Sequence, residues 1–433
     1  MKSGYLWLAS LVACPLSAWP LLLHRSYRRF SLPCRIGLAF ASGGVLLSTW
    51  MTLFALAGIL WQPIVLLAVS ALTAFLLRFL LRKQDSAAPE RTRPGLPAAM
   101  AAAISTLAVL IAVAATTSAA ATSPDLLYFW GPKAQAFAFA RTFDLAFLRD
   151  YYMQYVHVSY PPLVTNLSAL ASMIAGKFAW GAATLTFPLC LGALALSLPS
   201  VLRGIDARPS GVFASTFLVA TFGFLGNNLD VAGNGEPWLW IYETLAAALL
   251  VGPFAATAAG QLLAGLLIAG AATAKVEALP FALAVAALFL FLRRREIEIG
   301  PAAAFLLLPT AISLGAWLAF GATHRLFAFY EQYGSFFDIR WQDLGDDLGN
   351  VGKAIWSAGW ALPWLLPLAA LLAARKRSRL ALLPVLVSVV LAAFFVFTYL
   401  HQSDPAQWIS WSAGRVFSPI VAFLAVAAAI SGR

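Results

Sequence analysis

Long apolar stretches separated by short polar breaks recur from one end of the chain to the other. A helix of roughly 20 apolar residues crosses a hydrocarbon core of about 30 Å, and it satisfies its own backbone hydrogen bonds in lipid. The pattern therefore predicts an all-α polytopic membrane protein with about 13 transmembrane helices. The predicted spans are 4–23, 36–58, 62–81, 97–121, 181–202, 210–226, 238–257, 260–274, 279–292, 301–320, 357–374, 380–400 and 414–431.

Two breaks in this pattern, 122–160 and 321–356, are too long to be turns. The first is full of aromatic residues, whose rings favour the headgroup level of a bilayer, so we predict interfacial helices there. The stretch 163–176 is apolar but shorter than a span, which predicts a partial or re-entrant helix. The breaks divide the chain into an N-terminal three-span segment with a proline-rich linker (1–96), a module with the first large outer loop (97–292) and a group of C-terminal spans with the second (293–433).

Composition supports a lipid-solvated chain. Of the 433 residues, 61% are hydrophobic and 11% are charged, which is too little polar surface to cover a soluble globule. The net charge of +11 does not indicate nucleic-acid binding, because the basic residues sit in short loops rather than along one face. The basic clusters lie at His24–Arg35, Arg78–Arg93, Arg203–Arg208, Arg293–Arg295 and Arg375–Arg379.

These clusters all fall on one side if the predicted spans alternate in direction. The positive-inside rule makes that side the cytoplasm, and most of the 18 Asp and Glu then face outward. Only Lys2 precedes the first apolar stretch, whereas arginines follow it, so we expect an uncleaved first span with its N-terminus outside. The predicted location is a bacterial inner membrane, with any active site on the periplasmic or extracellular face.

Several outward residues could carry chemistry. Asp125 directly follows the fourth predicted span, and Lys133 lies two helical turns further on. A carboxylate at the membrane exit can accept a proton or hold a cation, although it can equally cap the following helix. The next outward loop contains Asp230 and Glu236 among amides, a composition that suits sugar hydroxyls, a metal ion or simply a turn. Tyr160 opens a Tyr-Pro-Pro-Leu turn before the short apolar stretch.

Three further charges lie at the membrane edge with almost no loop around them. Lys275 and Glu277 separate two spans in Thr-Ala-Lys-Val-Glu-Ala-Leu-Pro, and Arg415 begins the last span. Ionisable groups at such depth are costly and usually mark a site, and a guanidinium can hold a phosphate through two hydrogen bonds. The alternatives are an outer-surface turn for the first two and a snorkelling interfacial arginine for the third.

Other kinds of site are not supported by the sequence. Cys14, Cys34 and Cys190 lack the spacing of metal or redox motifs and are expected to be small core residues. The four histidines have no zinc-ligand spacing, and no Walker-type glycine loop suggests the use of ATP.

The order of these motifs resembles the integral-membrane GT-C glycosyltransferases, in particular the protein O-mannosyltransferase and aminoarabinose transferase group of bacteria. The resemblance rests on Asp125 with Trp130 and Lys133-Ala134, then Tyr160-Pro161-Pro162-Leu163, an outward acidic loop, and Thr273-x-Lys275-x-Glu277. It runs from about Thr122 to the C-terminus and omits the first three spans. Each motif is short, so the resemblance depends on the order of the motifs and on their shared position on the outer side.

What the resemblance implies is an inverting transfer of one sugar from a polyprenyl-phosphate carrier to a lipid or glycan acceptor on the outer face. Asp125 matches the acid that activates the acceptor hydroxyl as a general base or helps to organise a divalent metal ion, with Glu236 as the second implied ligand. Here Asp125 lacks the paired acid common in the family, which leaves metal dependence open, and no other cofactor is implied. The implied substrate-binding residues are Trp130, Lys133, Tyr160, Asp230, Glu236, Lys275, Glu277 and Arg415.

Two alternatives stay open. A lipid-linked saccharide or anion transporter, or a flippase, also uses membrane carboxylates and basic groups, but it usually has paired repeats that this sequence lacks. An O-antigen ligase or polymerase is also a multi-span protein with an outer loop. Its main loop normally comes late in the chain, whereas the richest loop here, 122–160, comes early.

Overall fold

Helices make up every regular element that the computed structural model describes. The described residues are 2–82, 124–150, 157–204, 235–326, 339–356, 381–402 and 404–431, with Gly233 and eight single positions between 103 and 116. Within them, eight helical stretches are long and apolar enough to cross a membrane. These are Ser3–Leu22, Leu32–Leu56, Pro63–Leu81, Trp180–Arg203, Val276–Arg293, Ile299–Thr323, Leu382–Tyr399 and Pro405–Ile430.

The all-helical, multi-span architecture agrees with the sequence pattern, but the count of about 13 spans stays a prediction. The predicted spans 210–226 and 357–374, most of 97–121 and the linker 84–97 lie outside the described residues. Two more correspond to helices shorter than a full span: α12 (Glu236–Leu250) has 15 residues and α13 (Ala258–Ala274) has 17. The division into three segments likewise stays a prediction.

Local sequence explains where several helices begin. Ser31 accepts a hydrogen bond from the Cys34 amide at the start of α3 (Leu32–Leu56), and Thr257 accepts one from Gly260 at the start of α13. Such side-chain caps satisfy backbone donors that the first turn of a helix leaves unpaired. Proline at the first position favours the same ends, as in α4 (Pro63–Leu81).

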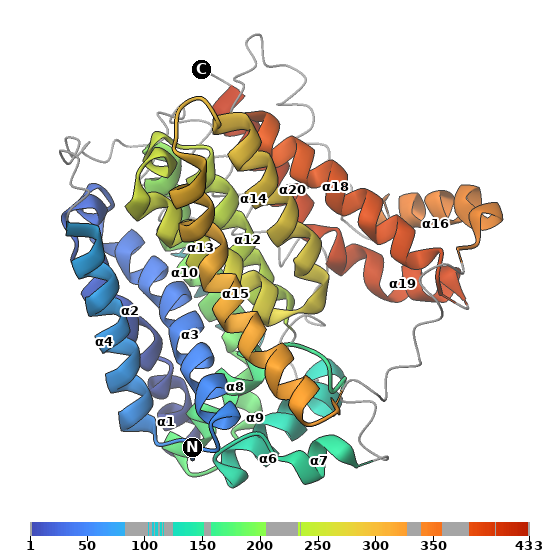
Figure 1. The fold of residues 1–433 in the computed structure, drawn as a ribbon. Coiled ribbons are helices and arrows are strands. Elements are labelled where there is room, and N and C mark those ends of the chain that lie inside the picture. Colours follow the sequence, from blue (N-terminus) through green and yellow to red (C-terminus); the bar gives the residue numbers. More distant parts are fainter. Residues whose placement is uncertain are drawn as a thin grey trace.

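The helices form a bundle with α13 at its centre (Figure 1). On one side lie α3, α4 and α2 (Ala13–Leu22); on the other lie α14 (Leu279–Arg293), α18 (Leu382–Tyr399) and α20 (Ser418–Ser431). Between them stand α10 (Thr186–Arg203), α12 and α15 (Ile299–Thr323), of which α12 and α15 pack on α13. To the side project α16 (Leu344–Trp356) and α19 (Pro405–Val416), which pack on each other.

The central helix α13 is buried along its whole length except at Ala258. Its small residues let neighbouring helices approach closely, which is a common device in membrane bundles. At Gly270, an added Cβ would lie 2.3 Å from the Tyr242 ring of α12. That ring is fixed in turn, because its hydroxyl donates a 3.0 Å hydrogen bond to the Ala41 carbonyl of α3.

Short helices cross one end of the bundle, where the sequence predicts the first outer loop. Here lie α6 (Gly131–Ala140) and α7 (Leu145–Arg149), together with α9 (Trp180–Thr184) (Figure 1). The apolar stretch predicted at 163–176 is α8 (Leu163–Ala175), a largely buried helix of 13 residues and therefore too short to span. Cys14, Cys34 and Cys190 are buried and free, as expected for core residues.

Basic residues gather at the end of α12 and α13 that lies away from Glu236 and Lys275. Arg29 lies 4.6 Å from the Phe254 ring centroid, and Arg293 donates a 3.2 Å hydrogen bond to the Gly252 carbonyl. Both contacts lie in the turn between α12 and α13, whereas Lys275 follows the far end of α13. At 1.5 Å per residue, the 17 residues of α13 separate the two ends by about 25 Å.

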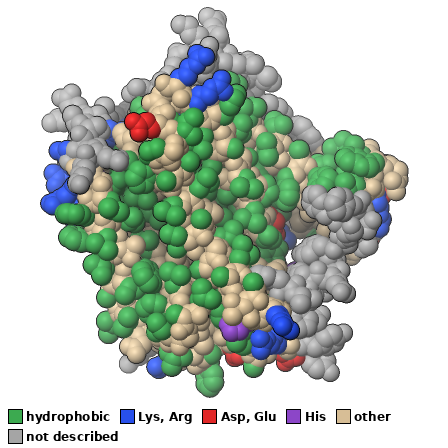
Figure 2. All heavy atoms as spheres, in the orientation of Figure 1, with side chains coloured by type: hydrophobic (Ala, Val, Ile, Leu, Met, Phe, Trp, Pro, Cys, Tyr) green, Lys and Arg blue, Asp and Glu red, His purple; other side chains and the backbone are tan. Residues whose placement is uncertain are grey.

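Hydrophobic side chains dominate the middle of the surface seen in Figure 2, and most charged side chains lie toward its edges. The exposed apolar side chains include Phe75 and Phe79 of α4 and Leu308 and Leu318 of α15. A broad apolar surface of this kind suits lipid rather than water.

Candidate active site

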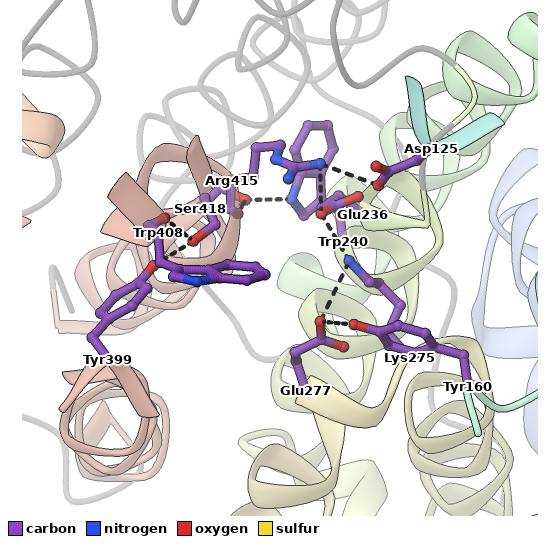
Figure 3. A network of polar contacts seen from close by, with 11 residues as sticks. Asp125, Tyr160, Glu236, Trp240, Lys275, Glu277, Tyr399, Trp408, Arg415 and Ser418 are labelled. Carbon is purple, nitrogen blue, oxygen red and sulfur yellow. Dashed lines mark hydrogen bonds and ion pairs between the residues drawn. The ribbon is translucent and has the colours of Figure 1, made fainter. Parts of the chain in front are cut away.

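Asp125, Glu236, Lys275 and Arg415 meet in one cluster although they are far apart in the chain (Figure 3). Each sits at a break in helical structure. Asp125 precedes a single π-helical turn, η3 (Leu126–Trp130), and Glu236 is the first residue of α12. Lys275 is extended, with φ −149° and ψ 149°, between α13 and the 3₁₀ turn η7 (Val276–Ala278). Helix ends can bring polar groups to one depth in the bundle without interrupting the backbone hydrogen bonds inside a helix.

The Arg415 guanidinium joins two carboxylates. Its Nη1 lies 3.2 Å from Asp125 Oδ2 and 3.5 Å from Glu236 Oε1. The Asp125 side chain makes no hydrogen bond that caps the η3 helix, so the capping alternative does not describe its position. Nor is Arg415 a lone snorkelling arginine, because both contacts are to acids.

Lys275 continues the network on the other side of Glu236. Its Nζ lies 2.9 Å from Glu236 Oε1 and 3.7 Å from Glu277 Oε1, and its side chain is only 7% exposed. Glu277 Oε1 also accepts a 2.7 Å hydrogen bond from the Tyr160 hydroxyl. Lys275 is therefore a buried ion-pair partner rather than part of a solvated turn.

Further hydrogen bonds hold the helix end that carries Arg415. Trp240 of α12 donates to the Ser418 hydroxyl at 2.6 Å, and that hydroxyl donates to the Arg415 carbonyl. Tyr399 of α18 and Ser412 of α19 share a 2.8 Å hydrogen bond near the same helix end. These hydrogen bonds tie the backbone around Arg415 to α12, α18 and α20, which suits a site that holds a fixed geometry.

The two acids that meet Arg415 have opposite pKa shifts. Burial and the nearby Glu236 raise the pKa of Asp125 above its ordinary value, against the opposing effect of Lys275 and Arg415. Burial also disfavours ionised Glu236, but Lys275 and Arg415 outweigh it and bring its pKa to about 2. The pKa of Lys275 is raised despite burial, because Glu236 and Glu277 favour its charged form. Asp125 is therefore the more basic acid, and Glu236 is a permanent counter-ion.

A cavity adjoins the cluster. Its lining includes Glu236, Lys275, Glu277 and Arg415, with Leu391 and Phe395 of α18 as apolar wall. The cavity is small, with a volume of about 10 Å³, which is room for one water molecule. Its lining combines charged groups at one level with apolar side chains beside them.

Trp130 and Lys133 lie next to the cluster rather than in it. Trp130 is buried with its ring centroid 5.7 Å from that of Tyr160. The Lys133 amine donates a 3.0 Å hydrogen bond to the His157 carbonyl, and burial lowers its pKa to about 7. Lys133 makes no ion pair with the described acids, so its amine is separated from the Arg415 network. Asp230 lies outside the described residues.

One ionisable residue that lines the cavity was not predicted from the sequence. Glu243 follows Glu236 by two helical turns on the same face of α12, and it lines the cavity with only 2% of its surface exposed. The signal was present, since a lone acid in the apolar run Trp-Leu-Trp-Ile-Tyr-Glu-Thr-Leu is unusual inside a predicted span.

The described acids do not form a ready metal site. Among the residues that the structure describes, no three His, Cys, Asp or Glu side chains lie close enough to hold an ion together. Asp125 and Glu236, the implied ligands, both face the Arg415 guanidinium, which would repel a divalent cation. The metal stays a prediction.

Comparison of the chain with protein-family models, with curated proteins and with solved structures finds no match.

Proposed function

We propose that this chain is a membrane glycosyltransferase. It moves one sugar from a polyprenyl-phosphate donor to a hydroxyl acceptor at the bundle end that carries Asp125 and Arg415. The observation that carries the proposal is the cluster itself, in which a raised-pKa carboxyl and two cations stand beside a partly apolar cavity. Basic segments gather at the opposite end of α12 and α13, which by the positive-inside rule supports a periplasmic or extracellular position for the cluster.

The donor phosphate is expected to meet Arg415 first. The Arg415 side chain is 25% exposed, whereas that of Lys275 is 7% exposed and already paired at 2.9 Å. A phosphate oxygen that hydrogen-bonds the guanidinium competes with Asp125 for it. Donor binding then frees the Asp125 carboxylate for the acceptor.

The transfer step follows from this exchange. Asp125 takes the proton of the acceptor hydroxyl while the hydroxyl oxygen bonds to the anomeric carbon on the face opposite the phosphate. The bond between that carbon and the phosphate oxygen breaks, and its electron pair stays on the phosphate. Arg415 stabilises the developing negative charge, and Lys275 adds to the local positive potential. The products are an inverted glycoside, a polyprenyl phosphate and protonated Asp125.

Asp125→Asn tests the base directly. The amide keeps the size of the side chain but takes up no proton, so turnover should fall by about 10²- to 10⁴-fold. Purified wild-type and variant protein in lipid nanodiscs receive a panel of labelled polyprenyl-phosphate sugars, and glycosidic product is measured. Asp144→Asn serves as the control, because this acid only caps α7. A folded Asp125→Asn protein with full activity would overturn the base assignment.

A transporter or flippase is the second candidate, and Glu243 favours it, because buried membrane carboxyls often carry protons in transporters. The same incubation separates the two. A transporter moves labelled donor between leaflets and forms no glycosidic bond, whereas a transferase forms that bond.

A further inference from the structure

Glu243 has an unusual position in the cavity. It is the seventh residue after Glu236 on α12, which places it about 10 Å deeper along the helix axis. Its Oε2 is buried and has no hydrogen-bond partner among the described residues, and the same is true of Glu277 Oε2. Both carboxyl groups line the same cavity.

No cation within ion-pair distance compensates Glu243 among the described residues. Lys275 pairs with Glu236 and Glu277, and Arg415 pairs with Asp125 and Glu236. The other helices that line the cavity, α18 and α20, contribute Leu391, Phe395 and Pro419. An ionised carboxylate without a partner is costly in such surroundings, whereas a neutral carboxylic acid is tolerated.

The charge balance around the cavity makes the same point. Among the described residues around the cavity, two cations, Lys275 and Arg415, lie near four carboxyl groups when Asp125 is included with Glu236, Glu243 and Glu277. With every acid ionised, negative charges outnumber positive ones, and an anionic phosphate would enter against that excess. A proton on Glu243 reduces the excess without breaking an ion pair.

We propose that Glu243 is a proton-binding site at the inner end of the cavity, and that its proton allows the cavity to accept an anionic ligand beside Arg415. The proton site stands on the geometry of the cavity alone. Its consequence for ligand binding rests on the proposed function.

Infrared spectroscopy tests the proton site without any ligand. Protein in nanodiscs at neutral pH should show the carbonyl band of a buried carboxylic acid, and Glu243→Gln should remove that band. Glu236→Gln is the matched control on the same helix, and it should leave the band in place. Should Glu243→Gln fail to fold, Glu243→Asp should shift the band instead. A wild-type spectrum without the band, or a band unchanged in both Glu243 variants, would overturn the proposal.

Binding of farnesyl phosphate, a short polyprenyl phosphate, tests the consequence. If binding requires one proton on Glu243, affinity should fall by up to about tenfold per pH unit once that proton is lost. The Glu243→Gln protein should bind with little of this pH dependence. A dependence equal in both proteins would overturn the coupling. Absence of any binding, with the infrared band present, would count against the proposed function and leave the proton site standing.

Discussion

Asp125 and Glu236 both contact Nη1 of Arg415, but their surroundings differ. Glu236 has a second cation, Lys275, at 2.9 Å, whereas Asp125 has Glu236 as a neighbouring negative charge. One acid is therefore held ionised, and the other is poised to take a proton. The sequence predicts all four residues as site candidates, because charges at the membrane edge stand out. It does not predict their pairing, since Asp125 and Arg415 are 290 residues apart.

Acid should weaken the Glu236 ion pairs. The pKa of Glu236 is lowered from 4.5 to about 2 in the folded protein, so its contribution to stability is present above pH 4.5 and is lost as pH falls toward 2. At neutral pH, Glu236→Gln should destabilise the protein by about 3 kcal/mol.

Thermal unfolding of both proteins across this pH range measures the effect. The gap in unfolding temperature should be constant near neutrality and should close below pH 4.5. Glu298→Gln removes an exposed acid and is the control. A gap that persists unchanged in acid would show that the ion pairs do not stabilise the fold.

At the scale of elements, periodicity and length predict α3, α4, α15 and α18 well, because these are long apolar helices with one uniform environment. Prediction is poorer at breaks. The span predicted at 238–257 ends as a helix at Leu250, and Pro253 opens a separate turn. The last predicted span, 414–431, begins earlier in the structure, because α19 starts at Pro405 behind the Asp404 cap. Interruptions of this kind depend on tertiary contacts that a hydropathy pattern does not contain.

Close packing of α12 on α13 gives an element-scale prediction. Gly270→Ala places a methyl group 2.3 Å from the Tyr242 ring. The hydrogen bond from the Tyr242 hydroxyl to the Ala41 carbonyl opposes a shift of that ring. Overpacking of this size should destabilise the protein by about 1–3 kcal/mol. A lowered unfolding temperature in detergent is the readout.

Gly315→Ala is the matched control, because nothing lies within 4 Å of the Cβ that it adds to α15. It should leave stability unchanged or raise it slightly through helix propensity. Equal unfolding temperatures for the Gly270 and Gly315 variants would contradict the packing argument.

At the scale of the whole molecule, α12 and α13 link a basic end to the end that holds the cluster. The sequence predicts this opposition from alternating spans, and the contacts of Arg29 and Arg293 agree with it. The fold alone does not determine which end faces the cytoplasm, because orientation depends on charge asymmetry across the membrane.

Cysteine labelling tests the orientation. Ala406 is exposed at the start of α19, the helix that carries Arg415, and Arg294 is exposed at the basic end, so each is replaced by cysteine; the native cysteines are buried. A membrane-impermeant maleimide applied to intact spheroplasts should label the first variant and not the second. Permeabilised cells should label both. Reversed labelling would place the cluster on the cytoplasmic face and remove the proposed access to outer acceptors.

The late position of Arg415 in the chain has a consequence for biosynthesis. Asp125, Glu236 and Lys275 are synthesised well before α19. Asp125 therefore enters the membrane before its ion-pair partner Arg415 has been made. The site is therefore completed only when α19, near the end of the chain, has been inserted. A nascent chain that stops before α19 lacks the ion pairs of Arg415 with Asp125 and Glu236, so the cluster is complete only in the full-length protein.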